Sequence, residues 1–308
     1  DAHALMDLST LLQLRGHREI ALATQLQALG MQQVYSLPTA TGEPKIKVLA
    51  IMAPGDLMSN TPLEFLLEDS DVALDILYVG AGLPSPGALP DHDVLFIAVG
   101  ESEQTLPLLQ ELENVVASWP RPVLNQPGRI ANMSRDAACA LLKSTPGVLM
   151  PATLRIGRVT LQDIGEGGVD ISSVLEDGAF PVIVRPVDSH AGQGLAKLDA
   201  AADIAIYLQA MPQAEFYIAR FIDYRAPDGL FRKYRIVLIE GRPFLCHLAI
   251  SHHWMIHYLN AGMAESAGKR AEEALHGQLR CRFRAAPCSS TARNPRARRT
   301  RLPGHRLW

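Results

Sequence analysis

The sequence predicts an α/β protein whose second part is α+β. Three patterns support this fold class. Apolar residues recur at helical spacing over residues 2–36, short apolar strands alternate with helices over residues 46–124, and two strand pairs with glycine-containing turns lie between residues 180 and 250. A chain of 308 residues has room for two or three domains.

The first segment is predicted to be a pair of short helices. The apolar period breaks near Gly16 and stops at Gly30, which favours two helices over one long helix. The residues that set the period are Leu5, Leu8, Leu11, Leu12, Ile20, Leu22, Leu26 and Leu29. We expect residues 1–45 to form this pair. It is compatible with the end of a helical repeat array, although one pair does not establish a repeat.

Residues 46–125 are predicted to form a small parallel-sheet domain. The expected strands are "KIKVLAIMA", "VALDILYV", "DVLFIAVG" and "RPVLN", with a helix over "TLPLLQELENVVASW". These strands are nearly continuous in apolar residues, which is typical of parallel strands that are covered on both faces.

Residues 126–268 are predicted to form the α+β part. A helix is expected over "SRDAACALLKST", and two strands, "FPVIVRPV" and "GLAKLD", flank a glycine loop. A helix over "AAADIAIYLQAM" and a strand over "EFYIARFID" follow. The run "KYRIVLIEGRPFLCHLAI" is predicted to be a hairpin that turns at Glu240–Gly241.

Charge is distributed unevenly along the chain. The formal net charge is −3, but residues 276–308 hold nine arginines and no lysine, aspartate or glutamate, so this segment is near +9 and the remainder near −12. We expect residues 269–308 to be a basic, disordered tail. It is either an arm for nucleic acid or an anionic surface, or the product of a G+C-rich gene read out of frame; we favour the second and do not expect a nucleic-acid partner.

Neither a membrane span nor a signal peptide is predicted. No apolar run approaches the roughly 20 residues that cross a bilayer, and the start "DAHALMDLST" has no basic segment followed by an apolar one. The four cysteines do not suggest a disulfide framework, and Cys139 and Cys246 are expected in the core. We therefore expect a cytoplasmic location. The missing initiator Met leaves open that sequence precedes Asp1.

The glycine loop in "VIVRPVDSHAGQGLAKLD", residues 182–199, suggests backbone brought close to an anion. Dinucleotide-binding loops and P-loops place such a turn between a strand and a helix, whereas a strand follows here. The loop is therefore interpreted as the tip of a β-hairpin whose backbone N–H groups cover phosphates. The alternative is a plain tight hairpin turn.

Several motifs in order resemble the ATP-grasp superfamily, most closely its prokaryotic glutathione-synthetase-like and D-alanine–D-alanine-ligase-like branch. The resemblance covers residues 122–263. It rests on "PVLNQPGRI", "LLKSTPGVLMPAT", "PVIVRPVDSHAGQGL", "IARFIDYRAPDGLFRKYRIVLIEGRPF" and "HYLNAGM". It implies a two-lobed ATP-grasp domain at 126–268, incomplete at its C-terminus, behind a pre-ATP-grasp domain at 46–125.

The resemblance implies nucleotide-binding roles for several residues. Arg185 stands where the family has a lysine that holds the α-phosphate, unless it pairs with an acid across the cleft instead. Ala137 occupies the position of the second lysine, and Arg135, or else Lys143, is expected to substitute. The flap residues would be Ser189, His190, Gly192, Gln193 and Gly194, and the backbone of Phe221 and Ile222 would pair with adenine.

Catalytic and substrate roles follow in the same way. Arg235 matches the family arginine that grips the acyl substrate or its phosphate, and Lys233 projects to the same side of a strand. His253, His257 and Asn260 are expected at the substrate. The His253/His257 spacing also permits a zinc site or packing against Trp254, but no HExxH motif accompanies it, and no metal ligand is predicted.

The activity implied is ATP-dependent ligation of a carboxylate to an amine or thiol through an acyl-phosphate. Mg²⁺ is expected for the family, but its acid and "E-x-N" ligands are not visible after Gly262, where Glu265, Glu272 and Glu273 lie on an apparent helix. The chain as given is therefore expected to bind nucleotide better than it catalyses. The alternatives are a non-catalytic nucleotide-binding module, or nucleic-acid binding through the tail. The sequence makes no prediction of the substrates or the oligomeric state.

Overall fold

The computed structural model describes residues 1–37, 39, 42–176, 178–190, 192–239, 241–256 and 261–278. The described chain divides into two compact units, unit 1 (Asp1–Met133) and unit 2 (from Ser134 onward). Each is described by itself. The predicted domain boundaries stay predictions.

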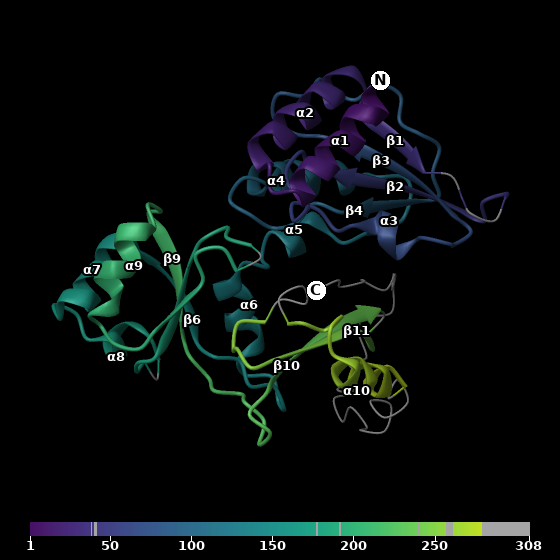
Figure 1. Ribbon diagram of the computed structural model, residues 1–308. Helices are drawn as coiled ribbons and strands as arrows, with labels where there is room; N and C mark the ends of the chain where they lie inside the picture. The colour runs from purple at the N-terminus through teal and green to yellow at the C-terminus, as the bar shows by residue number, and fades with distance from the viewer. Residues whose placement is uncertain are drawn as a thin grey trace, which may run out of the picture. The chain divides into compact units, whose positions relative to one another are not determined.

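Unit 1 is built on a five-stranded sheet in the order β1-β3-β2-β4-β5 (Figure 1). Its strands are β1 (Val34–Leu37), β2 (Ile46–Met52), β3 (Val72–Tyr78), β4 (Val94–Ile97) and β5 (Val123–Leu124). The last four are mutually parallel, as predicted, whereas β1 joins the edge antiparallel to β3. Residues 34–36 were predicted to be helical, and this was wrong. The extended strand Val34–Leu37 instead supplies one edge of the sheet.

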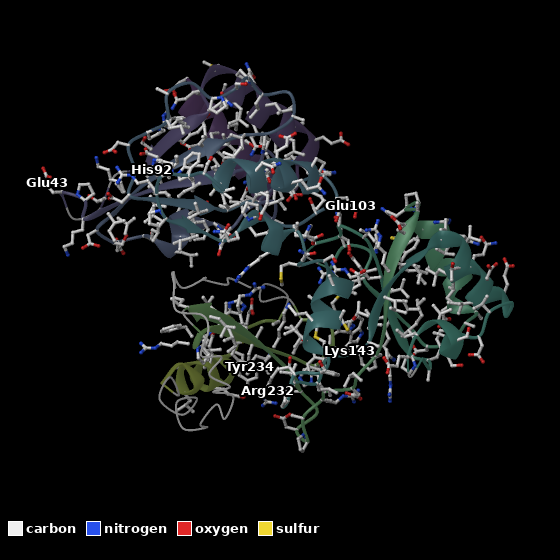
Figure 2. All side chains as sticks on the ribbon, turned by 180° about the vertical axis from the view of Figure 1, so that it is seen from behind. Glu43, His92, Glu103, Lys143, Arg232 and Tyr234 are labelled. Carbon is white, nitrogen blue, oxygen red and sulfur yellow. The ribbon has the colours of Figure 1, made fainter. Side chains whose placement is uncertain are left out.

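The helices of unit 1 are α1 (Ala2–Leu14), α2 (Arg18–Met31), α3 (Leu63–Leu66), α4 (Leu106–Val116) and α5 (Pro127–Ile130). The predicted N-terminal pair is confirmed: α1 and α2 pack together, and Ser9 Oγ donates to the Ala21 carbonyl at 2.7 Å. Leu109 and Leu112 of α4 lie in one core cluster with the apolar side chains of β2 and β4. Trp119 packs against this cluster, and its Nε1–H donates to Nε2 of His92 at 3.1 Å (His92 is labelled in Figure 2).

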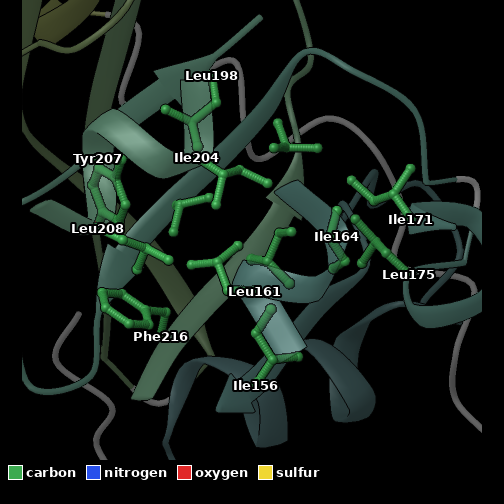
Figure 3. Close-up of a cluster of buried hydrophobic side chains, with 13 residues drawn as sticks. Ile156, Leu161, Ile164, Ile171, Leu175, Leu198, Ile204, Tyr207, Leu208 and Phe216 are labelled. Carbon is green, nitrogen blue, oxygen red and sulfur yellow. The ribbon is translucent and has the colours of Figure 1, made fainter. Parts of the chain in front are cut away.

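Unit 2 contains an antiparallel four-stranded sheet in the order β6-β9-β7-β8. Its strands are β6 (Thr153–Gly157), β7 (Val182–Pro186), β8 (Ala196–Leu198) and β9 (Glu215–Arg220). Helices α7 (Arg158–Glu166) and α9 (Asp203–Ala210), with the short α8 (Ile171–Val174), bury their apolar sides with the sheet. Figure 3 shows this core, in which Leu161, Ile204 and Phe216 meet. Helix α6 (Arg135–Leu142) contacts β6.

The second sheet of unit 2 is the hairpin of β10 (Phe231–Ile239) and β11 (Arg242–Ser251). Its turn lies where it was predicted, and a bulge shifts the register between Arg235 and Ile236. Helix α10 (Ala267–Gln278) packs along β11. Its Glu272 binds Arg232, labelled beside Tyr234 in Figure 2, with 2.6 Å between Oε1 and Nε.

Three further outcomes concern the fold predictions. Cys139 is buried as expected, but Cys246 is exposed, so its core assignment was wrong. No helix of the described residues is long and apolar enough to cross a membrane. The disordered tail was predicted to begin at residue 269, and this was wrong for residues 269–278, which belong to helix α10; the rest of the predicted tail lies outside the described residues.

Candidate functional site

The loop between β7 and β8 is held by the side chain at the end of β7. Arg185 Nε donates to Ser189 Oγ at 3.0 Å, and its Nη2 donates to the Ser189 carbonyl. Ser189 Oγ in turn donates to the Pro186 carbonyl at 2.7 Å. The strand pair predicted around the glycine loop is thus confirmed, and one cation organises the loop.

The two glycines of the loop both adopt positive φ, Gly192 at 79° and Gly194 at 62°. At Gly194, a Cβ atom would lie 2.7 Å from Cδ of Pro186 and 2.9 Å from Sδ of Met211. Its carbonyl accepts a bond from Tyr207 Oη at 2.8 Å. Gly194 therefore has a packing role on α9. Within the loop, the N–H of Gln193 donates to the His190 carbonyl at 2.9 Å.

Arg185 and Arg135 lie within electrostatic reach of one another, although they are far apart in sequence. Burial first, and then the positive charge of Arg135, lower the pKa of Arg185 to about 10. Arg135 is the first residue of α6. The rival residue Lys143 instead pairs with Glu176 at 3.3 Å (Lys143 in Figure 2). The structure thus brings Arg135, and not Lys143, toward Arg185.

Lys233 and Arg235 of β10 extend the same group of cations. Burial, Arg235 and Arg185, in that order, lower the pKa of Lys233. The Lys233 residue is exposed as a whole, but its Nζ donates to the Ile256 carbonyl at 3.0 Å, which shelters the ammonium itself. Arg135, Arg185, Lys233 and Arg235 therefore converge from α6, β7 and β10. We call these four residues the cation cluster.

His247 joins the cation cluster and was not predicted. It lies directly opposite Arg235 in the β10–β11 ladder, so the two side chains share a face of the hairpin. Burial, then the charge of Arg235, lower the pKa of His247, while Glu273 opposes this and Lys233 adds to it. If the pairing continued without interruption from the turn, Cys246 would lie opposite Arg235. The bulge between Arg235 and Ile236 makes His247 the partner instead.

The segment after β9 presents the residues that were predicted for adenine. The Phe221 N–H donates to the Pro181 carbonyl at 3.0 Å, which fixes this backbone to the strand start at β7. Lys197 of β8 lies over the Phe221 ring at 5.0 Å from its centroid, and Trp254 meets the same ring edge-on at 5.8 Å. Ile222 follows, half-buried. Lys197 and Trp254 were not predicted here.

The predicted substrate residues are only partly described. His253 lies in a bend, where its Nδ1 accepts from the Met255 N–H at 3.1 Å and its ring packs on Trp254 at 5.6 Å. His257 and Asn260 lie outside the described residues. The surroundings of His253 thus fit packing against Trp254 better than a zinc site.

The described carboxylates do not fit a Mg²⁺ site at the cation cluster. In the described ranges, no three His, Cys, Asp or Glu side chains gather as metal ligands would. Glu272 is bound to Arg232, and Glu273 accepts from the Leu248 N–H at 3.2 Å. Both lie on α10, where the sequence predicted a helix and no "E-x-N" strand.

No protein-family model matches the chain, and the search of curated proteins finds no match. Solved structures that this one resembles include ATP-grasp proteins. One is the RimK domain ATP-grasp protein from Sphaerobacter thermophilus, with 16% identity, 73% of this chain and 81% of that chain covered, and a TM-score of 0.40.

Two further ATP-grasp structures are similar. D-alanyl-alanine synthetase A from Vibrio cholerae has 11% identity and a TM-score of 0.42, covering 69% of this chain and 68% of that one. Carboxyaminoimidazole ribonucleotide synthase from Aspergillus clavatus, complexed with ATP, has 12% identity and a TM-score of 0.41, covering 67% of this chain and 54% of that one. The function proposed below rests on the chain's own residues.

Proposed function

We propose that unit 2 binds ATP, and that the chain is of the ATP-grasp ligase type, joining a carboxylate to an amine or a thiol. The observation that carries this proposal is the cation cluster. Its members come from three elements, and the charges of the neighbouring arginines lower the pKa of Arg185 and of Lys233. Such mutual repulsion is costly unless an anion offsets it, and a triphosphate has the charge and the length to do so.

The loop between β7 and β8 is the proposed cover for the phosphates. Its N–H groups and the positive φ of Gly192 and Gly194 suit the close approach of an anion. Arg185 would face the phosphates from below, and each charge-assisted hydrogen bond of this kind contributes roughly 1.5–3 kcal/mol. The guanidinium of Arg185 could make two parallel hydrogen bonds to a phosphate, which a lysine ammonium could not.

The adenine is proposed to lie against the Phe221–Ile222 segment. The Phe221 N–H is already bonded to the Pro181 carbonyl, so the Phe221 carbonyl and the Ile222 N–H are the proposed contacts. The ring of Phe221, with Lys197 on its face and Trp254 at its edge, would form one wall.

In the proposed reaction, a carboxylate oxygen of the substrate attacks the terminal phosphorus, and ADP leaves. An amine or thiol then attacks the acyl carbon of the acyl-phosphate, and inorganic phosphate leaves. Arg235 and Lys233 would hold the carboxylate and stabilise the negative charge that develops on the transferred group. Mg²⁺ supplies charge neutralisation to such reactions, but the described residues do not fit it, and no step is assigned to it.

The test has two arms. Isothermal titration with ATP measures binding, and an ADP-release assay across carboxylate–amine and carboxylate–thiol pairs measures ligation. We expect ATP binding, and ADP release that depends on one pair. Binding without substrate-dependent ADP release would favour the non-catalytic module instead. No binding, in a protein shown to be folded by circular dichroism, would remove the proposal.

A further inference from the structure

Tyr207 ties the loop between β7 and β8 to helix α9. Its Oη donates to the Gly194 carbonyl at 2.8 Å. Tyr207 is only 8% exposed, and its ring meets the Phe216 ring edge-on, with 5.7 Å between the centroids (Figure 3). Both residues belong to the core between the four-stranded sheet and its helices. The hydroxyl therefore reaches the loop from a position that packing holds fixed.

Gly194 is closely packed on the side of the protein. A Cβ atom at this residue would lie 2.7 Å from Pro186 Cδ, at the end of β7, and 2.9 Å from Sδ of Met211, which follows α9. Packing alone does not fix the direction of a glycine peptide, because glycine changes its backbone angles at little cost. The hydrogen bond from Tyr207 supplies that direction.

The peptide groups on both sides of the Gly194 N–H are held. The Gln193 N–H donates to the His190 carbonyl at 2.9 Å, and the Leu195 N–H donates to the Gly192 carbonyl at 3.1 Å. The Gly194 N–H itself makes no hydrogen bond with a residue in the described ranges. It is a donor that this stretch can offer to a phosphate, and its direction depends on the peptides that flank it.

Release of the Gly194 carbonyl would therefore affect binding as well as stability. Without the bond from Tyr207, the loop would sample other backbone conformations, and a nucleotide would have to order it before the N–H groups could cover the phosphates. This cost falls on the phosphates that the loop contacts. A nucleoside monophosphate, held by Arg185 at its one phosphate, would not meet it.

We propose that Tyr207 is a positioning residue that sets the preference of this site for nucleoside triphosphates over monophosphates. It acts through Gly194, by holding the loop in the conformation that covers the β- and γ-phosphates. This inference rests on the proposed function, because it concerns the nucleotide that the same site binds.

The experiment measures the affinities of ATP, ADP and AMP for the full chain and for Tyr207→Phe by titration calorimetry. We expect the substitution to weaken ATP binding by roughly tenfold, to weaken ADP binding by less, and to leave AMP binding within about twofold. Ser9→Ala is the matched control, because it removes a buried hydroxyl-to-carbonyl bond of similar length, 2.7 Å, in unit 1. It should lower the stability of the fold and leave the three affinities unchanged.

Amide exchange of the ligand-free protein gives a second readout. The backbone amides of residues 192–195 should exchange faster in Tyr207→Phe than in the unmodified protein, whereas those of β7 should keep their rates. Equal exchange rates at residues 192–195 would mean that Tyr207 does not hold the loop, and the inference would be wrong.

The binding results separate the inference from the function on which it rests. A loss of ATP affinity with AMP affinity retained supports both. An equal loss for the three nucleotides, or no loss, overturns the inference and leaves the proposed function standing. Failure of the unmodified protein to bind ATP removes the proposed function itself. If circular dichroism shows that Tyr207→Phe does not fold, Phe216→Leu keeps the hydroxyl but removes the ring against which Tyr207 packs, and the same selective loss is expected.

Discussion

Arg185 is bonded to Ser189, four residues along the chain, through Nε to Oγ at 3.0 Å and through Nη2 to the Ser189 carbonyl. A single guanidinium thus both shapes the β7–β8 loop and contributes to the cation cluster. These two roles are separable by substitution, because Ser189→Ala removes one loop contact and leaves the charge in place.

Arg185→Ala is expected to weaken ATP binding by about tenfold or more, which corresponds to roughly 1.4 kcal/mol per decade. Titration calorimetry measures this. Ser189→Ala should weaken binding by much less, and Lys143→Ala should have no effect. Unchanged affinity for Arg185→Ala would exclude this residue from the site, together with much of the argument for the family.

Gly194→Ala is expected to destabilise the fold. The new methyl group would meet Pro186 and Met211 at less than 3 Å, in a backbone conformation with φ of +62°. Strain and overpacking together predict a loss of roughly 2–4 kcal/mol in the free energy of unfolding. Gly229→Ala is the matched control, since φ there is +79° but no atom lies within 4 Å. Equal losses in urea unfolding would show that the contacts at Gly194 relax without cost.

Tyr35→Phe is expected to leave the free energy of unfolding unchanged or raise it by up to about 1 kcal/mol. The Tyr35 hydroxyl is buried and has no hydrogen-bond partner in the described part of the chain. Tyr207→Phe removes the bond to the Gly194 carbonyl and should lower the free energy of unfolding by roughly 0.5–1.5 kcal/mol. A destabilising Tyr35→Phe would mean that the hydroxyl is bonded in solution.

Asp228 should titrate far below an ordinary aspartate. Hydrogen bonds from Arg232 and from the Leu230 N–H lower its pKa from 3.8 to about 2. Because the pKa of the folded state is the lower one, the ionised carboxylate stabilises the fold above about pH 4, and this contribution is lost as the pH falls from 4 toward 2. Carbon-detected NMR titration should give a midpoint near 2, moving toward 3.8 in Arg232→Met. An Asp228 titration midpoint that is the same in Arg232→Met as in the unmodified protein would contradict the pairing of Asp228 with Arg232.

Much of the fold was predictable because the local patterns and the tertiary structure agree. The continuous apolar strands of unit 1 form a parallel sheet, and Gly16 marks the break between α1 and α2. The strand β1 was missed because it is four residues long and follows α2 closely. Its extended conformation comes from pairing with β3, which a local pattern does not reveal.

The elements β6, α7 and α8 were also missed. Only Ile156 of β6 is buried, so the strand has no apolar run to mark it. Arg158 at the start of α7 instead donates to backbone carbonyls near the end of α9. Contacts of this type join residues that are far apart in sequence. They hold α7 in place, and no local sequence pattern predicts them.

The candidate site shows the same limit at a single residue. The β10–β11 pairing is regular from the turn, at Ile239 and Arg242, as far as Ile236 and Leu245. If it stayed regular for one more pair, Cys246 would lie opposite Arg235. The bulge at Arg235 shifts the partner to His247 and leaves Cys246 exposed. One extra residue exchanges the two faces of a strand, which is why His247 could not have been found at this site from the sequence alone.

The contact of Trp254 with Phe221 gives the protein an intrinsic optical probe. The indole meets the Phe221 ring at 5.8 Å, beside the proposed adenine contact, and the Trp254 carbonyl is tied to Tyr224. Trp119, bonded to His92 in unit 1, lies in a separate packing environment and provides an internal reference emission. A nucleotide that enters beside Phe221 should change the polarity around Trp254 and leave that around Trp119 as it was. The sequence has a third tryptophan, Trp308, outside the described residues. Steady-state fluorescence of the double variant Trp119→Phe/Trp308→Phe, in which Trp254 is the one remaining indole, would then report occupancy directly, without a label.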